Sequence, residues 1–589
     1  MKSLKFIELQ NMWNWCHKQM TSSKPGLFAR EATGLVREIG FTLGVVIILS
    51  HVIGLGWQKR AFQFTGPRPM PTDLMPLGLP AMFWAFLVCG LIVLVTGYAA
   101  GYVAAAMPRS GGGYVTISRV LHPSIGYMSG WLMFLAEAFS FGLIGVAVFE
   151  GVSIFFGIAN APTPLPAWIG DPMWMFIGGL AIVWIFAVLA LLGTKLYGRL
   201  LEIMFFVPAA ITVIFFALWI AGALDPSLVV KGVTNVMGKP PSDFMTAAVN
   251  SGMTNNIAGF FDSFSFALGG AFWAFMGWYA TTFLAGEVKE ANKKLPMVLL
   301  TAGLVITAVY LSASSLAAAS TLNVAVTNIG GHQWSFFQAY AWLSYPAAGA
   351  PTAAAMSAVG ITGFLGAWST GIASMIASGM GLQWLSWIVA LGGVLWVAND
   401  IPPFLLVASR TFFAMSFDRM MPEKFAYVSE RWHAPVWAIL ITAVVAIPAC
   451  MAEANYPAGA ASYLAFAGVV GTDIFDAFFL TMFCISCMLL PLERKEIYDR
   501  AAVKHSIGSV VSLGFVATLG GVFCLYIFIK ESPWIWSLFT TGAAAADISS
   551  AIGFFGCIIV GILLYIGFMY RNTTKGVDMR TLYISIPPE

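Results

Sequence analysis

The sequence predicts an all-α, polytopic membrane protein with about twelve transmembrane helices. Three observations carry this prediction: 59% of the 589 residues are hydrophobic, only 10% are charged, and the mean hydropathy is +0.82. A water-soluble domain normally carries about a quarter charged residues, so a soluble enzyme is excluded. The net charge of +3 is spread over short polar segments, and we therefore expect no nucleic-acid partner.

Twelve apolar stretches are long enough to cross a bilayer. They lie near 38–57, 81–105, 124–157, 173–193, 200–223, 260–286, 297–318, 383–408, 435–452, 462–490, 509–529 and 548–570. With the N-terminus in the cytoplasm, 24 of the 30 Lys and Arg residues fall on the cytoplasmic side. This bias predicts that both termini are cytoplasmic, and we expect a multi-pass protein of the plasma membrane.

The spans divide the chain into four parts. We expect a cytoplasmic or interfacial segment at 1–35, a core of ten helices at 36–490, two peripheral helices within 491–570 and a cytoplasmic tail at 571–589. The N-terminal segment mixes charged and aromatic residues and lacks the apolar region of a signal peptide.

Two long segments of the core, 225–258 and 319–381, are predicted to lie on the external side. The part of the second segment at 352–381 is apolar enough to span. No Lys or Arg lies between Lys294 and Arg410, and both of these residues are predicted to be cytoplasmic. An even number of spans must separate them, so we expect 319–381 to form an external or re-entrant loop packed on the protein.

Glycine interrupts two of the predicted helices. The first helix carries Gly54-Leu55-Gly56, and the sixth carries Gly277 within the sequence F-M-G-W-Y. An unwound stretch in a bilayer leaves peptide groups without partners, which is costly unless they face a ligand or a polar cavity. Interrupted helices at corresponding positions of two halves indicate a transporter binding site, whereas glycines that only serve helix packing are an equally good explanation.

Three motifs follow one another along the core. Residues 107–131 contain P-R-S-G-G-G-Y and G-Y-M-S-G-W, residues 285–296 contain A-G-E-V-K and a later proline, and residues 409–436 contain S-R, F-D-R-M-M-P and A-P-V. Together they resemble the loop after helix 2 and the segments after helices 6 and 8 of the amino acid/polyamine/organocation (APC) transporter superfamily. The resemblance covers roughly residues 35–490.

The resemblance implies two inverted five-helix repeats with broken helices 1 and 6, and secondary active transport by alternating access around a midplane site. It places the substrate carboxylate on the N–H groups of Gly54, Leu55 and Gly56, and the substrate amino group on carbonyls of helices 1 and 6. It also implies that an aromatic gate and a side-chain pocket are formed by Trp273, Met276, Gly277, Trp278 and Tyr279.

Coupling of transport to a cation, Na⁺ or H⁺, is expected at helix 8. By the resemblance, the cation positions of sodium-dependent relatives correspond to Asn399 and Asp400. Their oxygens, with the carbonyls of Ser50 and Ile53 in helix 1, would suit a hard cation such as Na⁺ in a symporter. We expect no other metal and no cofactor.

Ionisable residues within spans cost at least about 2.5 kcal/mol to insert, so each is a candidate functional group. Asp400 is the first candidate. His51, three residues before Gly54, either lines the cavity and titrates near neutral pH or only packs between helices. Asp473 and Asp476 share one helix face and could form a gate, a proton relay or a contact to a cationic side chain. The alternative is a structural role, in which local unwinding of the helix supplies hydrogen-bond partners for the two carboxyl groups.

The expected function is amino acid transport, and the apolar residues of helix 6 favour a neutral, apolar amino acid. If Asp473 or Asp476 enters the pocket, a cationic amino acid or a polyamine becomes the better candidate. The alternative from another class is a non-transporting membrane subunit that acts as a scaffold or sensor, with the external segments binding protein partners. The sequence contains no H-E-x-x-H and no phosphate-binding loop, so no enzymatic activity is expected, and the partners are an amino acid or amine and the lipid bilayer.

Overall fold

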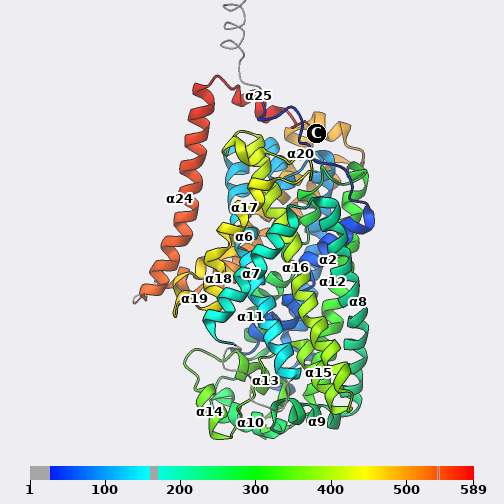
Figure 1. The fold of residues 1–589 in the computed structure, drawn as a ribbon, viewed down its shortest axis with the longest axis vertical. Coiled ribbons are helices and arrows are strands. Elements are labelled where there is room, and N and C mark those ends of the chain that lie inside the picture. Colours follow the sequence, from blue (N-terminus) through cyan, green and yellow to red (C-terminus); the bar gives the residue numbers. More distant parts are fainter. Residues whose placement is uncertain (1–26, 160–169, 540–541, 543, 589) are drawn as a thin grey trace, which may run out of the picture.

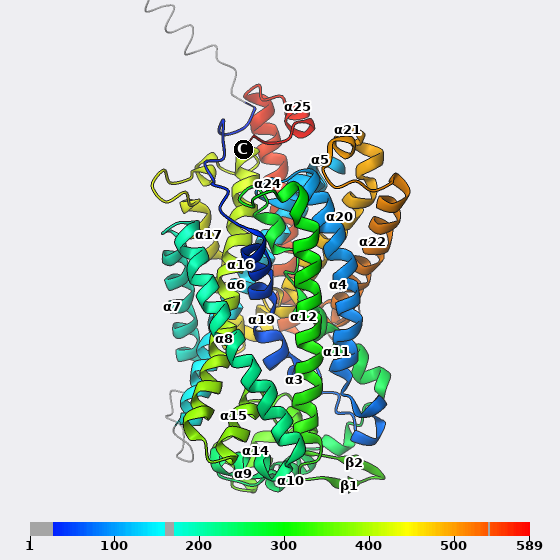
Figure 2. The ribbon, with the colours of Figure 1, turned by 90° about the vertical axis from the view of Figure 1, so that its right-hand side faces the viewer.

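A computed structural model describes residues 27–159, 170–539, 542 and 544–588. Residues 1–26 of the predicted cytoplasmic or interfacial segment at 1–35 lie outside these residues. The described chain forms an elongated helical bundle (Figures 1 and 2). One end carries α25 (Met579–Ile584) and the C-terminus, and the opposite end carries α9, α10, α13 and α14.

Eleven helical segments of the described chain are long and apolar enough to cross a membrane. They are Phe41–Gln63 (α2, η1 and α3), Ala81–Ala106 (α4), Pro123–Ala159 (α6), Pro172–Ala190 (α7), Leu196–Leu224 (most of α8, Thr194–Leu224), Ala291–Leu322 (α12), Gln383–Phe417 (α16), Val436–Ala454 (α17, Val436–Val445, and α18, Ile447–Ala454), Val469–Glu493 (α20), Ile507–Lys530 (α22) and Ala545–Thr574 (α24). These segments match eleven of the predicted spans, and the all-α, polytopic fold is confirmed.

The remaining predicted span, 260–286, is a helix that stops within the bundle. Helix α11 (Phe260–Phe275) has 16 residues and is followed by the short 3₁₀ turn η5 (Ala280–Phe283). The first span is also composite, because α2 (Phe41–Val52) is separated by a break from the π turn η1 (Gly56–Arg60) and α3 (Ala61–Gln63). Both helices that carry the glycine interruptions are therefore broken.

Short elements connect the spans. The other helices are α5 (Gly112–Val120), α9 (Pro226–Met237), α10 (Pro241–Asn250), α13 (Phe336–Ser344), α14 (Thr352–Ala358), α15 (Ser369–Gly379), α19 (Ala460–Tyr463), α21 (Lys495–Arg500) and α23 (Pro533–Trp536). The further 3₁₀ turns are η2 (Thr72–Leu74), η3 (Pro76–Gly78), η4 (Met253–Asn255), η6 (Glu423–Ala426), η7 (Ala465–Ala467) and η8 (Ser537–Phe539). Within the described residues, strands β1 (Thr327–Ile329) and β2 (His332–Trp334) form one antiparallel hairpin.

The apolar stretch at 352–381 does not span. It forms α14 and α15, and α15 has only 11 residues, which is about half the length that a transmembrane helix needs. Helix α15 packs against α9 and α16, so its apolar face is covered by protein. The segment thus forms helices that pack on the bundle, as expected for a loop packed on the protein. Its location on the external side of the membrane remains a prediction.

Helix α24 leans away from the bundle (Figure 1). Its apolar side chains are open to the surroundings, with Ile552 68% and Leu563 63% exposed. In water such a surface would be costly, whereas in a bilayer it faces lipid. The exposure pattern therefore agrees with a peripheral membrane helix.

Candidate functional site

The break in the first helix is held open by a side chain of α16. The Gly54 N–H turns back to the Val52 carbonyl at 3.1 Å, and the Leu55 N–H donates to Asp400 Oδ2 at 3.2 Å. A Cβ on Gly54 would lie 1.9 and 2.0 Å from the two carboxylate oxygens of Asp400. Glycine at position 54 therefore lets the Asp400 carboxylate lie directly on the unwound backbone.

The break in the sixth span lies beside the first. Gly277 follows α11 with a φ of +89°, a conformation that favours glycine. A Cβ at this position would lie 2.5 Å from the His51 ring, and a Cβ on Gly56 would lie 2.4 Å from the Cβ of Ala274. The two interruptions, more than 200 residues apart in sequence, thus form one feature in space.

Polar side chains lie within hydrogen-bond distance of backbone carbonyls at the two helix breaks. The Tyr310 hydroxyl of α12 lies within hydrogen-bond distance of the Val52 carbonyl and, at 2.7 Å, of the Ala274 carbonyl. Gln58 Nε2 donates to the Gly54 carbonyl at 3.0 Å. The polar groups of the unwound backbone are therefore largely paired within the chain, as a low-dielectric environment requires.

Replacing Tyr310 with Phe is expected to lower stability by about 1–3 kcal/mol, because the single hydroxyl hydrogen shared by the two buried carbonyls is lost. Thermal unfolding of the purified protein in one detergent measures the effect. Tyr526→Phe is the matched control, since Tyr526 is 56% exposed on α22. Equal melting temperatures for both variants would show that Tyr310 does not hold the two breaks together.

Segment 319–381 also reaches the break. Ser369 Oγ, at the start of α15, donates to the Trp57 carbonyl at 2.8 Å, and Thr370 Oγ1 donates to Gln58 Oε1 at 2.7 Å. The sequence does not signal this role, because Ser and Thr are ordinary residues at a helix N-terminus. Segment 319–381, which was predicted to be a loop packed on the protein, therefore contributes hydrogen bonds to the site.

A small closed cavity lies where the breaks meet. Its volume is about 20 Å³, enough for about one water molecule. It is lined by His51, Val52, Gly56, Ala136, Glu137, Ser140, Trp273, Ala274, Met276, Asp400, Phe404, Thr472, Asp473 and Asp476. Seven of the predicted site residues are thus brought together.

The polar lining of the cavity is dominated by carboxyl groups. Glu137, Asp400, Asp473 and Asp476 are each at most 5% exposed, and each has one carboxyl oxygen without a hydrogen-bond partner in the described part of the chain. His51 Nε2 lies 3.3 Å from Glu137 Oε2, but the two atoms do not have hydrogen-bond geometry. A carboxylate that is buried without a partner is costly, and a positive charge beside it would offset this cost.

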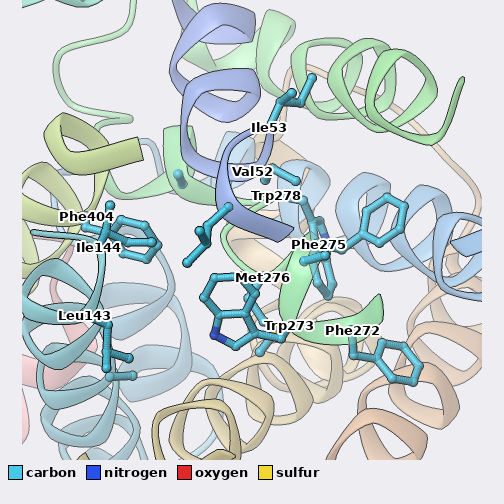
Figure 3. Close-up of a cluster of buried hydrophobic side chains, with 14 of the residues drawn as sticks. Val52, Ile53, Leu143, Ile144, Phe272, Trp273, Phe275, Met276, Trp278 and Phe404 are labelled. Atoms are coloured by element: carbon cyan, nitrogen blue, oxygen red, sulfur yellow. The ribbon is translucent and has the colours of Figure 1, made fainter. Parts of the chain in front are cut away.

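The apolar wall of the cavity comes from the sixth span. In Figure 3, Trp273 and Met276 lie between Phe404 on one side and Phe275 with Trp278 on the other. Trp273 and Met276 both line the cavity. The guanidinium carbon of Arg60 lies 4.8 Å from the centre of the Trp273 ring, which places a cation behind this wall.

A network of ion pairs continues from Arg60, and the sequence analysis did not identify it. Lys59 Nζ lies 2.5 Å from Glu150 and 3.1 Å from Glu453, and Arg60 lies 3.2 Å from Glu453. Arg60 and Glu453 also line a separate cleft of about 380 Å³. Arg60 thus contacts both Trp273 of the cavity wall and the larger cleft. A signal existed, since Lys59 and Arg60 follow directly after the predicted span 38–57.

Three of the five predicted pocket residues, Gly277, Trp278 and Tyr279, do not line the cavity. Trp278 is directed to α4, where its ring would lie 3.3 Å from a Cβ on Gly97, and Tyr279 stacks on Phe479 with ring centres 5.9 Å apart. Neither lines the cavity. Helix α11 ends at Phe275 and Gly277 has a positive φ, so the side chains beyond this break no longer follow the face of α11.

The predicted cation ligands separate into two groups. Asp400 lines the cavity, whereas Ser50, Ile53 and Asn399 do not. Ser50 Oγ and both polar atoms of the Asn399 amide are buried without hydrogen-bond partners among the described residues. The substrate positions Gly54 and Leu55 form the break behind Asp400 and also lie outside the cavity lining.

Comparisons with known proteins agree with this architecture. A family model described as amino acid permease, a family of transporters, matches residues 74–578. The serine/threonine exchanger SteT of Bacillus subtilis (strain 168) is 24% identical over 287 residues, which are 48% of this chain and 54% of that protein. The chain thus spans about half the length of this relative. Because the family model covers most of the chain, the protein belongs to the amino acid permease family of the APC superfamily.

Proposed function

We propose that the protein is a secondary active transporter that carries a positively charged amino acid or amine by cation-coupled alternating access. The observation that carries this proposal is the set of four buried carboxyl groups around one cavity at two broken helices. The apolar residues of the sixth predicted helix favoured a neutral amino acid unless Asp473 or Asp476 entered the pocket. Both line it, so the geometry favours the cationic class.

The cationic class follows from the cost of burial. Removing a carboxylate from water costs several kcal/mol, and a nearby opposite charge offsets this cost. The nearest arginine, Arg60, is separated from the cavity by Trp273 and is paired with Glu453. An ammonium group of the substrate would supply the missing positive charge and donate to the unpaired oxygens.

Alternating access is supported by the closed cavity and its neighbouring cleft. A cavity of about 20 Å³ cannot hold an amino acid, so a substrate needs a rearrangement that enlarges it. Arg60, which belongs to the ion-pair network through Glu453, contacts Trp273 of the cavity wall and lines the cleft of about 380 Å³. Breaking this network would connect the two, which is the action of a gate.

For the coupling cation we propose a place between α2 and α16, which pack against each other. Ser50 and Asn399 contribute buried polar atoms without partners among the described residues. Pro402 and Pro403 have no N–H group, so the carbonyls of Ala398 and Asn399 lack their α-helical donors. Oxygen donors of this kind suit Na⁺.

The test is uptake into proteoliposomes that contain the purified protein. Labelled lysine, ornithine, putrescine, serine and leucine are compared under an imposed Na⁺ gradient and an imposed proton gradient. We expect uptake of positively charged compounds, and we expect Asp476→Asn to reduce it by about tenfold or more, because a charge-assisted hydrogen bond is worth about 1.5–3 kcal/mol. Asp262→Asn is the control, since Asp262 is half exposed on α11.

The outcomes separate the alternatives. Uptake confined to serine or leucine would contradict the cationic class while leaving a transporter. Absence of uptake for every compound under both gradients would favour the scaffold or sensor. Equal activity of the Asp476 and Asp262 variants would remove Asp476 from the substrate site.

A further inference from the structure

We infer that the protein binds an anionic phospholipid on the outer face of α8, with the phosphate in a basic cleft and one acyl chain in an adjoining apolar groove. None of the residues that line the cleft or the groove lines the cavity at the helix breaks. The inference therefore goes beyond the proposed function and does not depend on the substrate or on the coupling ion.

The first step of the argument is a cleft at the start of α8. It has a volume of about 320 Å³ and is bounded by three segments: the chain before α2, the turn between α7 and α8, and the loop between α16 and α17. Arg199, Arg431 and His433 line it, and its one acidic lining residue is Glu38.

The walls of this cleft contact one another directly. A Cβ on Gly193, which has a φ of +96°, would lie 2.5 Å from the Trp432 carbonyl oxygen, so the turn before α8 packs on the loop after α16. His433 Nδ1 lies 3.2 Å from the Gly34 carbonyl oxygen, which links the same loop to the chain before α2. The cleft is therefore formed by packed backbone segments from three parts of the chain.

The second step is the charge of the cleft. In the described chain, neither Arg199 nor Arg431 forms an ion pair with Glu38 or with another carboxylate, and both side chains are exposed. The guanidinium carbon of Arg431 lies 4.6 Å from the centre of the Trp432 ring, which leaves its N–H groups free to donate. A guanidinium group binds phosphate oxygens through two parallel hydrogen bonds, so the cleft suits a phosphate group.

The third step is an apolar groove that continues from the cleft along α8. Arg199 lines both the cleft and the groove. Positions 196, 199, 203, 206 and 210 are separated by three or four residues, so they form one stripe on the helix. Ile203 is 63% and Phe206 is 55% exposed. The basic cleft and the apolar groove are thus two parts of one continuous surface.

The length of the groove matches one leaflet of a bilayer. Its lining extends from Arg199 to Ile211, and these twelve residues of helix correspond to about 18 Å. Half of the hydrocarbon core of a bilayer is about 15 Å. Glu202 also lines the groove, but it lies within one turn of Arg199, so the apolar part begins at Ile203. An acyl chain whose phosphate lies at Arg199 would remain in this groove.

The place of the cleft identifies the source of the phosphate. The chain before α2 and the loop between α16 and α17 are predicted to be cytoplasmic, and the cytoplasmic leaflet contains anionic lipids that attract Lys and Arg. Trp432 and Trp437 are 38% and 46% exposed beside the cleft and in α17, as is common at the membrane interface. A phospholipid occupies both cleft and groove, whereas a free phosphate leaves the groove unused.

The test measures lipid binding to the purified protein in a neutral detergent. Native mass spectrometry counts bound lipid during titration with dioleoylphosphatidylglycerol or dioleoylphosphatidylcholine, which share their acyl chains and differ in the headgroup. We expect the first phosphatidylglycerol to bind at least about tenfold more tightly, because two arginines face an anionic headgroup. Equal affinities for the two lipids would overturn the inference.

Inorganic phosphate separates a lipid site from a simple anion site. We expect phosphatidylglycerol to raise the melting temperature of the wild-type protein, and the same concentration of inorganic phosphate to leave it unchanged. An equal rise with inorganic phosphate would show that the groove takes no part in binding and would contradict a lipid site. This comparison needs no variant protein.

The headgroup cleft is tested by the double variant Arg199→Gln, Arg431→Gln. We expect it to lose the preference for phosphatidylglycerol over phosphatidylcholine. Arg571→Gln is the matched control, since Arg571 is exposed at the end of α24 and lies 5.9 Å from the Phe568 ring but does not line the cleft. A preference retained by the double variant, or lost equally in the control, would contradict the assignment of the cleft.

The groove is tested by Ala210→Trp, which fills it with a large side chain. We expect phosphatidylglycerol to bind at least about tenfold more weakly. Val213→Trp is the control, since Val213 is 70% exposed on the same helix but does not line the groove. Both positions are exposed, and an unchanged melting temperature without lipid verifies that the variants fold. Equal lipid affinities of the two variants would contradict the acyl-chain site.

Discussion

Replacing Gly54 with Ala is expected to abolish transport. A Cβ at this position would lie 1.9 Å from Asp400 Oδ2 and 2.0 Å from Oδ1, far inside van der Waals contact. The Asp400 carboxylate would have to leave the Leu55 N–H, with which it forms a hydrogen bond of 3.2 Å. A displacement of about 1 Å at a binding site costs about 100-fold in rate, so initial uptake should fall by at least this factor.

The control for this variant is Gly508→Ala. Gly508 lies in α22 with no atom within 4 Å of an added Cβ, and alanine favours a helix more than glycine does. We expect wild-type uptake from this variant. Wild-type uptake from Gly54→Ala would show that the close packing of Asp400 on the break is unnecessary for transport.

Replacing Asp418 with Ala is expected to lower the stability of the protein by about 3–5 kcal/mol. Asp418 forms a two-pronged ion pair with Arg119, with distances of 2.5 and 2.8 Å, and it accepts from the Tyr114 hydroxyl at 2.8 Å. The side chains of Arg119 and Asp418 are at most 1% exposed. Loss of the carboxylate leaves the Arg119 guanidinium buried without its counter-charge, and thermal unfolding measures the result.

Asp262→Ala provides the comparison for this loss. Asp262 pairs with Arg68 at 3.4 Å, and both side chains are 51% exposed, so solvent screens the interaction. We expect its removal to cost at most about 1 kcal/mol. Similar melting temperatures for the Asp418 and Asp262 variants would contradict the expectation that the buried Arg119–Asp418 pair stabilises the protein much more than the exposed Arg68–Asp262 pair.

The positions of the membrane helices could be predicted from the sequence because their lengths are set by the bilayer. An apolar run of about 20 residues has few alternatives to a transmembrane helix. The interrupted spans were recognisable for the same reason, since glycines at 54 and 277 stand where a continuous helix is otherwise expected. Segment 352–381 shows the limit: its composition permits a span, and charge distribution together with packing on α16 decides against one.

The candidate site could be predicted only in part. Asp400, Asp473, Asp476 and His51 were recognisable because ionisable residues are rare in spans. Nothing in the sequence indicates that these groups share one cavity with Glu137 of α6. Such proximity depends on how α6, α16 and α20 pack, and residues hundreds of positions apart meet only through that packing.

The sequence by itself determined the class of the protein, the number and approximate bounds of its helices and the two places where helices break. These properties depend on local composition, because an apolar segment in a bilayer must pair its peptide groups within its own helix. The tertiary structure decided which polar groups meet. It placed Asp400 on the break beside Gly54, and directed Trp278 and Tyr279 to other helices. These contacts arise because peptide groups freed in a low-dielectric environment must find partners, and here the partners come from distant parts of the chain.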